Sequence, residues 1–138
     1  MRTRAKEEKA MQLATLEKYV SPVAEKLTLL VNGNIPRNGT IPEFVECCVT
    51  QCPATLDLKS KDGRSYTLAV SAVASTIHFA LLVGVKTFAD VTDSDRDVVA
   101  SFRKYVARLG RIGGTVVTAR VALSDNQATW LQMRNPVN

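Results

Sequence analysis

The chain has 138 residues, 46% hydrophobic and 22% charged, and its 18 Lys and Arg against 13 Asp and Glu give a formal net charge of +5. This composition is typical of one globular domain that buries a core without staples, so it excludes a disordered tail, a collagen-like repeat and a cysteine-stapled miniprotein. No apolar run reaches the roughly 18 residues of a membrane span, and Met1-Arg2-Thr3-Arg4 opens no apolar signal core, so we expect a soluble, non-secreted protein without a membrane partner.

The first part of the chain predicts helix. Residues Ala5 to Tyr19 are rich in Ala, Lys, Glu, Gln, Met and Leu and contain no Gly or Pro. Ser21-Pro22 is expected to interrupt this helix, and the piece from Val23 to Val31 either ends a helix or forms a strand. Residues 1–31 therefore form a helical N-terminal segment, and two Asn-Gly pairs signal turns shortly after it.

Three strands are predicted next. Leu56 and Leu58 share one face of the first, and Lys61-Asp62-Gly63-Arg64 supplies an Asp-Gly hairpin turn. The second alternates apolar and polar side chains from Tyr66 to Ala72. The third run, Ile77 to Phe88, is almost filled by apolar residues, so helix competes there, but its β-branched and aromatic content favours a strand.

Thr92-Asp93-Ser94-Asp95 begins the clearest helix, because it combines capping side chains with early acids. At 100° per residue one side of this helix is apolar, with Val98, Val99, Phe102, Tyr105, Val106 and Leu109. The other side is cationic, with Arg96, Arg103, Lys104, Arg108 and Arg111. Glycines at 110, 113 and 114 end the helix, and Thr115 to Leu123 is predicted as a strand with Arg120 opposite its apolar face.

These elements predict one α+β domain over residues 1–138, built on an antiparallel β-sheet with helices packed on one face and an N-terminal helix. Residues 54–123 hold the sheet and the basic amphipathic helix.

The excess positive charge lies late in the chain. Up to Phe102 there are 12 Lys and Arg and 12 Asp and Glu, whereas the rest carries six cations and the single acid Asp125. Such a cluster favours phosphate backbones or acidic surfaces, although a solvated face that keeps the protein soluble is the alternative. We therefore predict a nucleic-acid-binding surface that contains Arg103, Lys104, Arg108, Arg111 and Arg120.

No catalytic, metal or cofactor site is predicted. Cys47, Cys48 and Cys52 have unsuitable spacing for zinc and are expected to be small buried hydrophobes or free thiols, with an intersubunit disulfide as an alternative. His78 is the only histidine and lies in the middle of an apolar strand, where a packing role is more usual than catalysis. The acids from Asp90 to Asp97 are expected to cap the helix, so a non-enzymatic protein without a small-molecule substrate is predicted.

Residues 54–110 contain five predicted segments in a fixed order. They are a strand, the Lys61-Asp62-Gly63-Arg64 turn, a strand with Tyr66-Thr67-Leu68, a long strand that leads into Val91-Thr92-Asp93-Ser94-Asp95-Arg96, and a helix. This order resembles the coat proteins of single-stranded RNA bacteriophages. The resemblance implies a dimer with a continuous antiparallel sheet, helices interlocked across the dimer, and a self-assembling icosahedral shell. It also implies RNA on the sheet face opposite the helices, which would favour Lys59, Thr67, Ser71, His78 and Lys86 as contact residues over the helix cations. The N-terminal helix and the strand after the main helix depart from the family pattern.

The charge distribution and the resemblance together predict a self-associating viral structural protein of the coat or nucleocapsid type that binds RNA through the phosphate backbone, in a virion or the host cytoplasm. The alternative is a small assembly cofactor or adaptor whose basic helix docks on an acidic protein partner.

Overall fold

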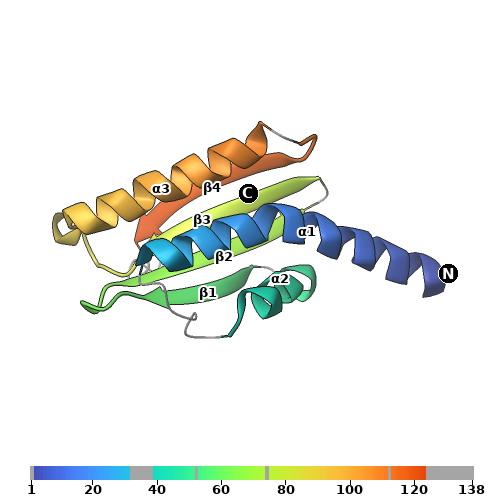
Figure 1. Cartoon of the computed structure of the whole chain (residues 1–138), viewed down its shortest axis with the longest axis horizontal. Coiled ribbons are helices and arrows are strands. Elements are labelled where there is room, and N and C mark those ends of the chain that lie inside the picture. The colour runs from blue at the N-terminus through green and yellow to red at the C-terminus, as the bar shows by residue number, and fades with distance from the viewer. Residues whose placement is uncertain (1, 32–38, 52, 74, 112, 124–138) are drawn as a thin grey trace.

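Helices occupy the first part of the chain, and a third helix precedes the last strand (Figure 1). The computed structural model describes residues 2–31, 39–51, 53–73, 75–111 and 113–123, with side chains from residue 12 onward. The elements are α1 (Arg2–Val31), α2 (Ile41–Thr50), β1 (Ala54–Lys59), β2 (Ser65–Val73), β3 (Thr76–Val83), the 3₁₀ turn η1 (Phe88–Asp90), α3 (Asp93–Gly110) and β4 (Val116–Leu123). The predicted α+β class with an N-terminal helix is confirmed.

The four described strands form one sheet in the order β1-β2-β3-β4. β1, β2 and β3 pair antiparallel, and the predicted alternation holds: Leu56 lies opposite Leu68, and both are buried on the helix-covered face. β4 instead pairs with β3 in parallel, so the sheet is mixed and not antiparallel throughout as expected. The cause is the connection through α3, because a crossover helix returns the chain to the end of the sheet at which β3 begins, so that β4 runs in the same direction as β3.

The three described α-helices lie on the same face of the sheet, with α1 crossing between α2 and α3 (Figure 1). The buried side chains of α1 fill the centre of this layer, and Phe44 from α2 and Phe102 from α3 pack at its two sides. The first turns of α1 extend past the sheet (Figure 1). The core therefore lies between one helical layer and one face of the sheet.

The predicted break at Ser21-Pro22 is wrong, because α1 continues through Pro22 to Val31. Proline inside a helix removes a hydrogen bond and costs about 3 kcal/mol relative to alanine. Fully buried side chains lie on both sides of it in the sequence, among them Val20, Val23 and Leu27. Each such burial contributes roughly 1.5–3 kcal/mol, so packing on the sheet outweighs the local preference.

Helix α2 was not predicted from the sequence. Its start is a capping box: the Thr40 hydroxyl accepts a hydrogen bond from the Glu43 N–H (3.3 Å), and the Glu43 carboxylate accepts one from the Thr40 N–H (3.4 Å). A Thr-x-x-Glu pattern before an apolar run was the available signal. Of the predicted turns before α2, Asn32-Gly33 lies outside the described residues.

Strand β3 ends at Val83, earlier than the predicted run to Phe88. The Val85 N–H donates to the Val83 carbonyl (2.8 Å), and a tight turn of this kind is common where a strand ends. Gly84 is required there, because a Cβ atom would lie 2.8 Å from the Ser65 carbonyl oxygen. The chain then passes through the exposed η1 turn to the predicted N-cap of α3, Thr92, which is confirmed.

Candidate nucleic-acid interface

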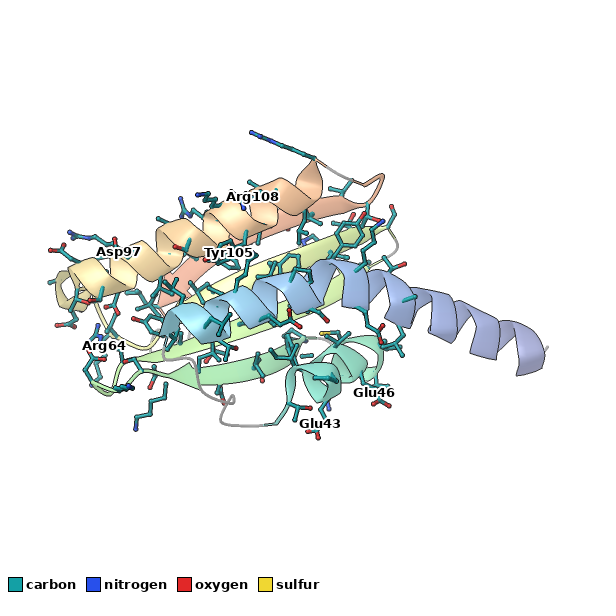
Figure 2. The ribbon with its side chains drawn as sticks, in the orientation of Figure 1. Glu43, Glu46, Arg64, Asp97, Tyr105 and Arg108 are labelled. Atoms are coloured by element: carbon teal, nitrogen blue, oxygen red, sulfur yellow. The ribbon has the colours of Figure 1, made fainter. Side chains whose placement is uncertain are left out.

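One side of α3, together with its C-cap residue Arg111, presents a row of cations. Arg103, Lys104, Arg108 and Arg111 are exposed, while Phe102 and Val106 turn the opposite side of the helix into the core. In Figure 2, Tyr105 lies on the side of α3 toward α1 and Arg108 on its outer side. The predicted separation of apolar and cationic faces on this helix is therefore present in the structure.

None of these four cations has a carboxylate partner among the residues that the structure describes. The ion pairs there involve other side chains, Arg64 with Asp95 and Arg96 with Asp93. Cations on one helix face that have no carboxylate partner in the described chain are available to attract an external anion. We define the α3 row as Arg103, Lys104, Arg108 and Arg111.

The other predicted cations do not extend the α3 row. Arg120 lies opposite Ala80 in the β3–β4 register, in phase with Thr118, whereas Val121 packs in the core. Because side chains alternate along a strand, Arg120 faces away from the helices, and the expectation that it backs the helix cations is wrong. Lys59 ends β1 and Lys86 follows β3, so the seven predicted cations occupy at least two separate surfaces.

The sheet face implied by the coat-protein resemblance is largely engaged in internal contacts. Thr67 donates a hydrogen bond to Asp57 (2.9 Å), and Ser71 is buried. The His78 ring Nδ1 and the Thr118 hydroxyl are hydrogen-bonded at 2.8 Å. Burial, and then the charge of Arg120, lower the pKa of His78, so this imidazole carries little positive charge at neutral pH. This face therefore offers phosphate fewer available cations than α3 does.

The described cysteines lie in α2. Cys48 is buried, and burial followed by the neighbouring Cys47 raises the pKa of its thiol to about 12. A thiol with so high a pKa is a weak nucleophile and a poor metal ligand, so Cys48 packs as a small apolar side chain. Cys52 lies outside the described residues.

In the described ranges, no group of three or more His, Cys, Asp or Glu side chains is placed to hold a metal ion. None of the described helices combines the length and the hydrophobicity that a membrane-spanning segment requires.

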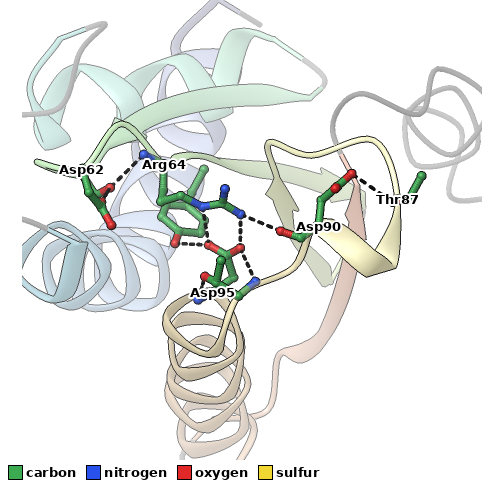
Figure 3. A network of polar contacts seen from close by, with 8 residues as sticks. Asp62, Arg64, Thr87, Asp90 and Asp95 are labelled. Carbon is green, nitrogen blue, oxygen red and sulfur yellow. Dashed lines mark hydrogen bonds and ion pairs between the residues drawn. The ribbon is translucent and has the colours of Figure 1, made fainter.

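A polar network centred on Asp95 positions α3, whereas the sequence predicts only a capping role for this residue (Figure 3). Its carboxylate accepts hydrogen bonds from the Thr92 N–H (2.9 Å), the Tyr66 hydroxyl (2.5 Å) and two nitrogens of Arg64, one of them Nε at 3.1 Å. Arg64 also donates to the Asp90 carbonyl (3.1 Å). The β1–β2 hairpin is thereby tied to the start of α3.

The hydrogen bonds decide the ionisation of Asp95. Burial by itself raises the pKa of this carboxyl, but the bonds from Arg64 and Tyr66 outweigh burial and lower the pKa to about 2. Burial and the Asp95 contact raise the pKa of the Tyr66 hydroxyl, which therefore stays protonated and donates. The signal in the sequence was Thr-x-x-Asp, which locates the cap but not the partners 29 and 31 residues away.

Comparison of the chain with protein-family models, curated proteins and solved structures gave no match. A function for this protein is therefore inferred from the geometry and charge described above.

Proposed function

We propose that this protein is a non-enzymatic viral structural protein of the coat or nucleocapsid type, and that the α3 row binds RNA through its phosphate backbone. The observation that carries the proposal is the row of four exposed cations on one helix face with no carboxylate partner in the described chain. Each phosphate that such a cation neutralises releases counterions, which supplies affinity without sequence specificity.

The helix is a suitable platform for this role. From Arg103 to Arg111 the row extends about 12 Å along α3, at about 1.5 Å per residue. The core contacts of Phe102 and the Asp95 network hold the helix on the sheet, so the cations are carried by a rigid element. A rigid row binds a polyanion with a smaller loss of entropy than a flexible basic tail does.

Self-association is the second part of the proposal. β4 is an outer strand of the sheet, and no described strand pairs with its outer edge. Unpaired strand edges can pair with a second chain, and a repeating shell needs such contacts between copies. Light scattering of the purified protein is expected to show dimers or larger particles, and a monomer at all accessible concentrations would contradict this part.

Salt dependence tests RNA binding by the wild-type protein. We expect fluorescence anisotropy with a labelled single-stranded RNA to give a slope of log K against log salt near −3 between about 50 and about 300 mM NaCl, since four phosphate contacts contribute about −0.7 each. Freshly purified protein should also show a high ratio of absorbance at 260 to 280 nm. Absence of binding at low salt, with a protein-like absorbance ratio, would contradict the proposal and leave an acidic protein as the partner of the α3 row.

A further inference from the structure

A groove of about 410 Å³ lies between α3 and the β3–β4 side of the sheet. Its apolar lining includes Val83 from β3, and Val121 and Leu123 from β4. The volume falls within the roughly 300–1,000 Å³ of sites that take small ligands. The groove adjoins the α3 row, because Arg103 belongs to both.

An exposed aromatic ring stands at this groove. Phe88, in η1, also lines it and is 81% exposed, more than any other large apolar side chain in the described chain. Single exposed apolar residues are common, but a ring that continues the apolar lining of a groove forms a larger apolar surface. Such a surface is suited to stacking against a planar ring.

Two guanidinium groups complete the groove. Arg96 and Arg103 both line it and lie seven residues apart on α3, which places them on the same side of the helix about 10 Å apart. The contact of Arg96 with Asp93 is 3.4 Å long between side chains that are 67% and 98% exposed. An ion pair of this kind is weak in water, so a phosphate can displace it.

We propose that the groove takes one unstacked base of a single-stranded RNA, with the base against Phe88 and the apolar lining and its flanking phosphates on Arg96 and Arg103. This inference rests on the proposed RNA binding and specifies it further. An apolar groove with cations about two helical turns apart suits a ligand that has a planar, weakly polar body and an anion on each side. A nucleotide within a strand has this pattern, whereas in duplex RNA the bases are stacked and paired.

The test compares Phe88→Ala with the control Val116→Ala, an exposed apolar side chain that does not line this groove. Because Phe88 is exposed, its removal leaves the core intact. We expect Phe88→Ala to bind a single-stranded RNA 10-mer about 5- to 150-fold more weakly than the wild type, the range for losing one stacked base. Affinity for polyphosphate, which has phosphates but no bases, should not change, and Val116→Ala should match the wild type with both probes.

A second variant gives a direct signal. In Phe88→Trp the indole should restore affinity, and single-stranded RNA should quench its fluorescence while polyphosphate should not. The groove assignment would be overturned by unchanged RNA affinity in Phe88→Ala, or by equal losses of affinity for RNA and polyphosphate. It would also be overturned if Phe88→Trp recovered binding to an acidic peptide but not to RNA. If the wild type itself binds no RNA at low salt, the proposed function fails instead, so the two failures are distinguishable.

Discussion

Asp95→Asn is expected to destabilise the protein by about 3 kcal/mol at neutral pH, the lower end of the range for breaking a buried ion pair. The substitution removes the charge that Arg64 neutralises, and it weakens the bond from Tyr66. The Asp95 side chain is fully buried, whereas 26% of the Arg64 side chain reaches solvent, which moderates the loss. Urea unfolding at pH 7 measures it as a lower midpoint at an unchanged slope.

The lowered pKa of Asp95 also makes the stability of the protein depend on pH. The pKa of Asp95 is about 2 in the folded protein against its ordinary 3.8, so this carboxylate stabilises the fold fully above about pH 4. The contribution is lost as the pH falls from about 4 to about 2, and it amounts to about 2 kcal/mol. Asp95→Asn should lack this part of the pH dependence.

Asp93→Asn is the matched control, since Asp93 lies in the same turn of α3 with a side chain that is 98% exposed. We expect its free energy of unfolding to stay within about 0.5 kcal/mol of the wild type both at pH 7 and in the range from about pH 4 to about pH 2. Equal destabilisation by the two variants would show that the first turn of α3 depends on its negative charge and not on the Asp95 network.

The triple variant Arg103→Glu, Lys104→Glu, Arg108→Glu is expected to lower RNA affinity by about 100-fold or more near physiological salt, because it replaces three attractive contacts with three repulsive ones. The slope of log K against log salt should become shallower, with its magnitude falling from about 3 to about 1 or less, since one cation of the α3 row remains. All three side chains are exposed, so unfolding should change by less than about 1 kcal/mol, including the unfavourable placing of acids toward the C-terminus of α3.

The control places acids on the other face of the sheet, in the double variant Lys59→Glu, Arg120→Glu. We expect this protein to keep most of its RNA affinity, because Arg120 faces away from α3. A loss as large as that of the triple variant would instead place RNA on the sheet, as the coat-protein resemblance implies. Anisotropy titrations at one salt concentration, run side by side, compare the two surfaces.

Local signals were sufficient for much of the fold. The Asp-Gly pair predicts the β1–β2 hairpin, and in the structure Gly63 has the positive φ that such a turn requires. The alternation of apolar residues with a period of two assigns Leu56 and Leu58 to the buried face. In α3, the Thr92 cap and the spacing of apolar residues predict both the start of the helix and the side that carries the cations. These features depend on residues within a few positions of each other, and for this reason one sequence is sufficient to detect them.

The sequence by itself therefore determined the α+β class, the hairpin, α3 and its cationic side. Only the tertiary structure decided that α1 continues through Pro22, that β4 joins in parallel, that Arg120 faces away from the α3 row, and that Arg64 meets Asp95. Each of these depends on which distant segment a residue packs against. Burial of apolar surface between such segments is large enough to override a helix breaker and to choose the neighbour of a strand, and it leaves no local pattern in the chain.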